Sequence, residues 1–124
     1  MEGQKKILVI DDEADIQKLL KMRLEQEGFL VITASDGESG VEQAELEMPD
    51  LVILDIMMPK VDGYSCLKEI RRIKKTKDIL VLMMSGKEEE KVRDLFAFQK
   101  ISGYLEKPFE LDNLIVKIKE ILKM

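Results

Sequence analysis

LVILDIMMPKVDG, residues Leu51–Gly63, begins with an apolar run that ends at a carboxylate and is followed by two turns. Its first four residues are all apolar, which is typical of a strand covered on both faces in a parallel sheet. The run ends at Asp55, and the Met58-Pro59 and Asp62-Gly63 pairs that follow are typical of turns. An acid at the carboxyl end of a buried strand lies where open α/β sheets bind their ligands. Asp55 could equally end the strand and cap the next turn, so it does not decide the function alone.

Composition limits the class of protein. With 124 residues, the chain is long enough for one domain, residues 1–124, and too short for two. No stretch resembles a signal peptide or a membrane span, and the lone Cys66 suits a reducing cytoplasm. The net charge of −5 argues against a general nucleic-acid-binding surface. The chain has no histidine, which excludes a hydrolase that depends on a catalytic histidine.

Strands and helices are predicted to alternate along the chain. Apolar runs predict five strands, at Lys5–Ile10, Leu30–Ala34, Leu51–Leu54, Ile79–Met84 and Gly103–Glu106. Each strand is followed by apolar residues at helical spacing, such as Ile16, Leu19, Leu20 and Leu24; Val41 and Ala44; Leu67, Ile70 and Ile73; Val92, Leu95 and Phe96; and the residues from Leu111 to Leu122. This alternation predicts a doubly wound parallel sheet with right-handed crossovers and helices on both faces. The basic run from Lys68 to Lys77 is expected to form a solvated helix face rather than a phosphate-binding patch.

Four of the five predicted strands end at polar or charged side chains, which are Asp11 with Asp12, Asp55, Ser85 and Lys107. Each of them alone has an ordinary explanation as a helix cap or a solvated charge. Because the carboxyl ends of parallel strands share one sheet edge, however, the side chains are expected to converge. Three carboxylates in one place repel one another unless a cation lies between them. Mg²⁺ suits this site because it accepts one or two carboxylates and keeps several waters.

As a set, these motifs resemble the receiver domain of bacterial two-component response regulators. The resemblance covers essentially the whole chain, and its motifs are Asp11-Asp12, Asp55 to Pro59 with Asp62-Gly63, Ser85, Tyr104 and Lys107-Pro108-Phe109. It implies a flavodoxin-like (βα)5 fold with a five-stranded parallel sheet of order 2-1-3-4-5. It also implies that a phosphoryl group is accepted on Asp55.

The resemblance assigns a role to each residue of the phosphoacceptor site. Asp12 and Asp55 would bind Mg²⁺, or Mn²⁺ in its place, together with the backbone carbonyl of Met57. Asp11 would assist them. Lys107 and Ser85 would contact phosphoryl oxygens, and the Lys107-Pro108 bond would be cis. A nucleophilic carboxylate must be ionised, which a nearby metal and ammonium favour.

Signal output and signal lifetime are also implied by the resemblance. Ser85 and Tyr104 would form a switch that changes the face built from the fourth helix, the fifth strand and the last helix. The side chains of Met57 and Lys87 would flank the water that hydrolyses the phosphoaspartate, which predicts slow hydrolysis. Two departures from the family pattern stand out. Lys100-Ile101 replaces a common Gly-Ala pair, and Gly86 predicts a looser loop after Ser85.

The implied partner is a histidine kinase or a histidine phosphotransfer protein, because this chain has no histidine to carry the donor group. The downstream target is not identified, no membrane or nucleic acid is expected to bind directly, and a monomer or a weak phosphorylation-dependent dimer is expected. One alternative is a Mg²⁺-dependent phosphohydrolase with an aspartyl-phosphate intermediate, which usually has a second Asp where this chain has Met57. Another is a small flavodoxin-like ligand-binding module. Against the latter, Asp11-Asp12-Glu13 occupies the turn where a glycine-rich phosphate loop would lie.

Overall fold

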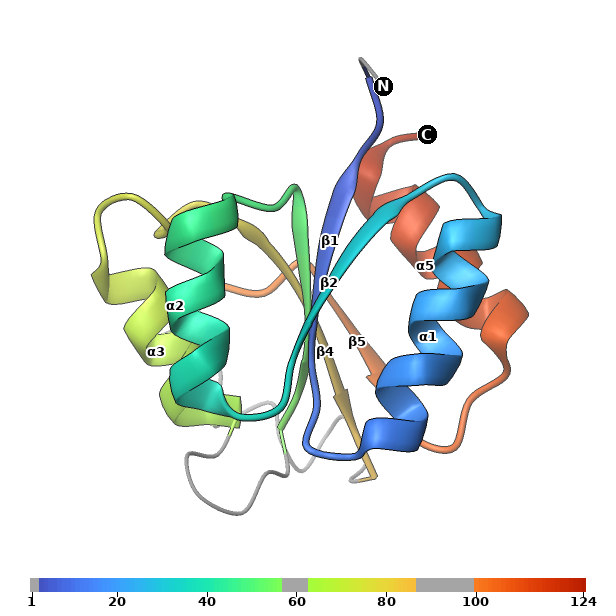
Figure 1. The fold of residues 1–124 in the computed structure, drawn as a ribbon, viewed down its shortest axis with the longest axis horizontal. Coiled ribbons are helices and arrows are strands. Elements are labelled where there is room, and N and C mark those ends of the chain that lie inside the picture. Colours follow the sequence, from blue (N-terminus) through green and yellow to red (C-terminus); the bar gives the residue numbers. More distant parts are fainter. Residues whose placement is uncertain (1–2, 57–62, 87–99) are drawn as a thin grey trace.

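The computed structural model describes residues 3–56, 63–86 and 100–124. Five parallel strands form one sheet in the order β2-β1-β3-β4-β5, which confirms the predicted fold. The strands are β1 (Lys6–Ile10), β2 (Leu30–Ala34), β3 (Leu51–Asp55), β4 (Leu80–Ser85) and β5 (Gly103–Glu106). All five carboxyl ends therefore lie along one edge of the sheet, the lower edge in Figure 1.

Helices cover both faces of this sheet, as the alternating pattern predicts. The described helices are α1 (Ala14–Gln26), α2 (Gly37–Glu47), α3 (Gly63–Arg72) and α5 (Leu111–Leu122). Figure 1 shows α1 and α5 on one face and α2 and α3 on the other. The expected fourth helix, with Val92, Leu95 and Phe96, lies outside the described residues. None of the helices in the described ranges is long and apolar enough to cross a bilayer.

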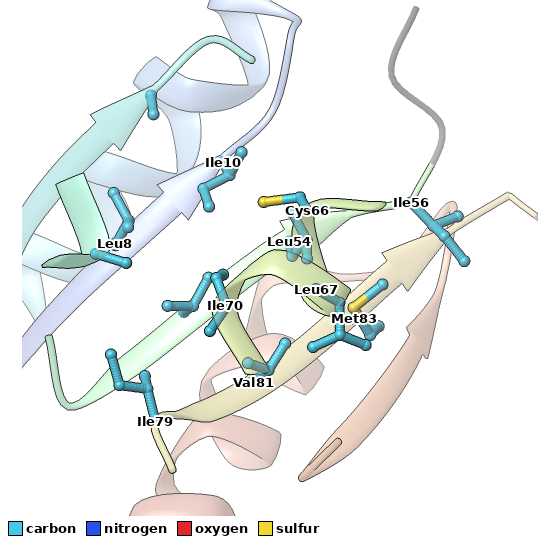
Figure 2. Close-up of a cluster of buried hydrophobic side chains, with 13 residues drawn as sticks. Leu8, Ile10, Leu54, Ile56, Cys66, Leu67, Ile70, Ile79, Val81 and Met83 are labelled. Atoms are coloured by element: carbon cyan, nitrogen blue, oxygen red, sulfur yellow. The ribbon is translucent and has the colours of Figure 1, made fainter. Parts of the chain in front are cut away.

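The unbroken apolar run of β3 is explained by its central position. β3 pairs with β1 on one side and with β4 on the other, and all of its residues are buried. Alternate residues along the strands point to opposite faces. Their side chains form part of two apolar clusters, one packed against α2 and α3 and one packed against α1 and α5. Figure 2 shows the first cluster, in which Leu54 of β3 packs with Leu67 and Ile70 of α3 and with the buried Cys66.

The start of α3 lies unusually close to the end of β3. A Cβ atom on Gly63 would lie 2.4 Å from both the carbonyl oxygen of Asp55 and the Cα of Ile56. The Gly63 N–H also donates to the Ile56 carbonyl at 2.9 Å. A glycine is therefore required where the helix begins, and it supports the strand end that carries Asp55.

The basic run at the end of α3 departs from the prediction at one residue. Lys68, Arg72, Lys74, Lys75 and Lys77 are exposed, as expected for a solvated face. Arg71 is instead half-buried, and its guanidinium donates to the carbonyl oxygens of Lys77, Ile79 and Lys100. The prediction is wrong for Arg71 because this side chain binds the backbone just before β4 and just before β5.

Candidate functional site

The strand-end residues predicted from the sequence come together at the carboxyl edge of the sheet. Asp55 is the last residue of β3 and Ser85 is the last residue of β4. Asp11 follows β1 directly and Lys107 follows β5 directly. These side chains lie at the ends of four different strands, so the fold itself places them together.

Lys107 is the cation at the centre of this site. Its Nζ lies 3.2 Å from Oδ2 of Asp55 and 3.3 Å from Oδ2 of Asp11. Both carboxylates are almost completely buried, at 3% and 0% exposure. Burial lowers the pKa of the Lys107 ammonium, but its attraction to Asp55 and Asp11 is stronger, so the pKa is raised above its usual value. Lys107 is therefore held in its charged form.

Asp11 carries a negative charge in an unfavourable position. Burial raises its pKa, and the neighbouring charge of Asp55 acts in the same direction. The backbone N–H of Glu13, which donates to Asp11 Oδ1 at 2.9 Å, and the Lys107 ammonium oppose this effect without cancelling it. The pKa of Asp11 is therefore raised, and additional positive charge at this site would stabilise its ionised form.

Two more carboxylates complete an acidic cluster. Oxygens of Asp11, Asp12, Glu13 and Asp55 all lie within 4.8 Å of one another, and those of Asp12 and Glu13 are on exposed residues. Oxygen ligands from carboxylates, open to water on one side, are the donor set that Mg²⁺ prefers. One ammonium does not neutralise four carboxylates, so the residues present fit a divalent cation.

Glu13 was not among the metal ligands predicted from the sequence. It is the residue before α1, and within the described part of the chain its side chain makes no hydrogen bond that caps the helix. The signal was its place as the third acid in the run Asp11-Asp12-Glu13. Its distance to Asp55 could be known only once the strands were placed.

The residues assigned to signal output lie on the neighbouring strands β4 and β5. Ser85 is fully buried, and its carbonyl accepts the backbone N–H of Lys107 at 2.6 Å. Tyr104 on β5 is half-buried and packs against the apolar cluster beneath α3. The Lys107-Pro108 bond is cis, as the resemblance implied. Met57 and Lys87, assigned to metal binding and signal lifetime, lie outside the described residues.

An apolar groove opens next to the acidic cluster, and sequence reasoning did not find it. It has a volume of about 340 Å³ and lies between α1 and the segment that joins β5 to α5. Its lining residues are Ile16, Leu19, Leu20, Pro108, Phe109 and Leu111, with Glu13 and Lys107 as the charged members. The two walls are distant in sequence, so no local pattern could predict that they meet. The groove shares Lys107 with the site around Asp55.

The family model and the curated relatives that this chain matches indicate the same protein family. Residues 7–119 match the response regulator receiver domain family. The alkaline phosphatase synthesis transcriptional regulatory protein PhoP of Bacillus subtilis is 44% identical over 119 residues, which cover 96% of this chain and 49% of that protein. The chain spans about half the length of the curated relatives it matches.

Solved structures share the fold over nearly the whole chain. The chemotaxis protein CheY4 of Vibrio cholerae matches with a TM-score of 0.90 and 25% identity, over 96% of this chain and 99% of that one. The receiver domain of the sensor histidine kinase PA1611 from Pseudomonas aeruginosa matches with a TM-score of 0.87 and 24% identity, over 98% and 100% of the two chains. That structure has a magnesium ion coordinated in its active site cleft.

Proposed function

This chain belongs to the response regulator receiver domain family, which acts in two-component signal transduction, and on that premise we propose that Asp55 accepts the phosphoryl group. The observation that carries the proposal is the position of Lys107 Nζ, 3.2 Å from the buried carboxylate of Asp55. Asp11 also contacts Lys107, but Asp55 is the acid of the cluster that ends the central strand. The domain acts in the cytoplasm as a phosphoacceptor, and not as an enzyme with a diffusible substrate.

Phosphoryl transfer to Asp55 needs little covalent chemistry from the protein. A carboxylate oxygen of Asp55 forms the bond to phosphorus while the bond from phosphorus to the donor nitrogen breaks, and that electron pair stays on the donor's imidazole. Lys107 binds a phosphoryl oxygen, and the Ser85 hydroxyl donates to another. Asp11, Asp12 and Asp55 would hold Mg²⁺, or Mn²⁺ in its place. The backbone carbonyl of Met57, which the resemblance names as a further ligand, lies outside the described residues. A bound metal would supply positive charge that offsets the charge of the phosphoryl oxygens.

Labelling with a small phosphodonor tests this function without a partner protein. In the presence of Mg²⁺, acetyl phosphate is expected to add one phosphoryl group, seen by intact mass and removed by hydroxylamine, which cleaves acyl phosphates. Chelation of the metal is expected to prevent labelling, because the carboxylate cluster then repels the anionic donor. Equal labelling with and without a chelator would contradict the role of the metal.

The phosphoryl donor is a phosphohistidine on a histidine kinase or a phosphotransfer protein, and the groove beside Lys107 receives the segment that carries it. This chain has no histidine of its own, so the donor lies on another chain. The groove is lined mainly by apolar side chains, and Glu13 and Lys107 are its charged members. Lys107 also contacts Asp55, to which the donor's phosphoryl group must be brought. Leu19, which is 42% exposed, offers apolar surface for such a contact.

Leu19→Glu tests the docking groove. A charge in the groove is expected to slow phosphoryl transfer from a phosphorylated kinase by roughly tenfold or more, because it places an unpaired carboxylate in an apolar contact. Labelling by acetyl phosphate should stay at the wild-type rate. Met22→Glu is the matched control, since Met22 is 56% exposed on the same helix and lies beyond the residues that line the groove. Equal transfer rates for the two variants would show that the donor docks elsewhere.

Ser85 and Tyr104 couple phosphorylation to the face of the predicted fourth helix, β5 and α5. The new phosphoryl oxygens draw the Ser85 hydroxyl towards them, and Tyr104 on the neighbouring strand moves in response. A full population shift from 1:99 to 99:1 requires about 5.5 kcal/mol, more than one or two charge-assisted hydrogen bonds provide. A mixed population is therefore expected even when Asp55 is fully phosphorylated.

Ser85→Ala is expected to keep phosphorylation at Asp55 while reducing the response of β5. Amide NMR shifts of Gly103–Glu106, recorded with and without the phosphoryl mimic beryllofluoride, measure that response. The wild-type shifts should be larger, because the hydroxyl is the donor that links the phosphoryl group to the strand pair. Identical shifts in both proteins would remove Ser85 from the switch.

A further inference from the structure

Gln17 lies on α1, outside the acidic cluster, but its side chain contacts the backbone that carries the cluster. Its Nε2 donates to the carbonyl oxygen of Asp11 at 2.5 Å and to Oγ of Ser35 at 3.1 Å. The carbonyl oxygen of Ala34 lies at 3.4 Å and is a weaker third acceptor. The Gln17 amide thus joins the end of β1 to the end of β2, at the edge of the sheet where Asp55 lies.

The hydrogen bond from Gln17 adds to other hydrogen bonds that hold Asp11 in place. The Asp11 N–H donates to the Ala34 carbonyl at 3.1 Å, and the Asp11 carboxylate accepts from the Glu13 N–H and from Lys107. These bonds hold the amide and the side chain of Asp11 and leave its carbonyl to Gln17. Because a peptide unit is planar, fixing that carbonyl also fixes the plane that extends to the Cα of Asp12.

The orientation of the Asp12 carboxylate depends on this peptide plane more than the orientations of the buried Asp11 and Asp55 carboxylates do. Asp12 is exposed, whereas Asp11 and Asp55 are held by burial and by Lys107. The direction in which the Asp12 carboxylate leaves the chain follows from the orientation of the peptide between Asp11 and Asp12. Gln17 supplies the required hydrogen-bond donor as a neutral amide. A lysine or arginine there would add positive charge next to the cluster.

We propose that Gln17 is a positioning residue of the metal site, which orients the Asp12 carboxylate through the carbonyl of Asp11. The inference rests on the proposed metal site and is independent of phosphoryl transfer. The backbone N–H of Gln17 donates to the Glu13 carbonyl at 3.1 Å, so α1 begins without help from this side chain. Residues that orient metal ligands typically change metal affinity when they are replaced.

Magnesium titration calorimetry on the unphosphorylated chain tests the inference. Gln17→Met keeps the length and helix propensity of the side chain but removes the donor. It is expected to raise the Kd for Mg²⁺ roughly tenfold. Gln26→Met, an exposed glutamine at the end of the same helix, is the matched control and should keep the wild-type Kd. Ser35→Ala removes one contact of Gln17 but keeps its bond to Asp11, so it should also keep the wild-type Kd.

Two further measurements separate positioning from plain stability. The amide resonance of Asp12 should shift in metal-free Gln17→Met, and the melting temperature in a chelator should change little. A lower melting temperature with a wild-type Kd would overturn the inference, as would equal Kd values for Gln17→Met and Gln26→Met. A wild-type chain that binds no Mg²⁺ would overturn both the inference and the metal site. Mg²⁺ binding that Gln17→Met leaves unchanged would overturn the inference alone.

Discussion

Asp55→Asn is expected to abolish phosphorylation of this chain. The asparagine side chain has the shape of aspartate but no ionised oxygen, so it cannot form an acyl phosphate. It also leaves Lys107 with Asp11 as its remaining buried carboxylate partner. Intact mass after incubation with acetyl phosphate and Mg²⁺ should show no added phosphoryl group. The matched control is Asp78→Asn, which changes an exposed acid just before β4 and should label like wild type.

Residual labelling would show whether the assignment to Asp55 is wrong. The other acids of the cluster, Asp11, Asp12 and Glu13, have oxygens within 4.8 Å of those of Asp55 and remain in the variant. If Asp55→Asn still gains a phosphoryl group at the wild-type rate, one of these carboxylates is the acceptor. Circular dichroism should show a folded variant, so that an absence of labelling reports on chemistry.

Gly63→Ala is expected to cause the largest loss of stability of any glycine-to-alanine change in the described residues. The new Cβ would lie 2.4 Å from backbone atoms of Asp55 and Ile56. These residues are held against β4, because Asp55 pairs with Met84 and the Ile56 N–H donates to the Met84 carbonyl at 2.9 Å. We expect the free energy of unfolding in urea to fall by about 3 kcal/mol. Labelling should slow as well, because the displaced backbone carries Asp55.

Gly103→Ala is the control for this substitution. Its Cβ would meet side-chain carbons of Ile121 and Leu82 at 3.1 and 3.3 Å, and the ends of these side chains can adjust. Its loss of stability should therefore be clearly smaller than that of Gly63→Ala. Equal unfolding free energies for the two variants would contradict the close approach of α3 to β3.

The fold was largely predictable because a strand that is buried on both faces of a sheet has an unbroken apolar sequence. A strand covered on both sides must be apolar at every position, and Leu51 to Leu54 meet that requirement without a break. The convergence of Asp11, Asp55 and Lys107 followed from the same argument, since parallel strands end at one edge. The order of the strands did not follow from periodicity and came from the family resemblance.

Features that depend on contacts between distant segments could not be predicted. Arg71 has the sequence signature of a solvated helix residue, but it binds carbonyl oxygens of segments that only the folded chain brings near. Glu13 joins the cluster because the end of β3 lies across from the start of α1. Gln17 lies near the start of α1 and donates to Asp11, which precedes the helix, and to Ser35, which follows β2, and no spacing rule marks these contacts.

The site of phosphorylation can be read chemically in the wild-type protein. Borohydride reduces a phosphoaspartate to homoserine, so peptide sequencing after labelling with acetyl phosphate and reduction identifies the acceptor directly. We expect homoserine at position 55, because Asp55 is the buried carboxylate that ends β3 and contacts Lys107. Homoserine at position 11 or 12, or an unmodified aspartate at position 55 in fully labelled protein, would contradict the account.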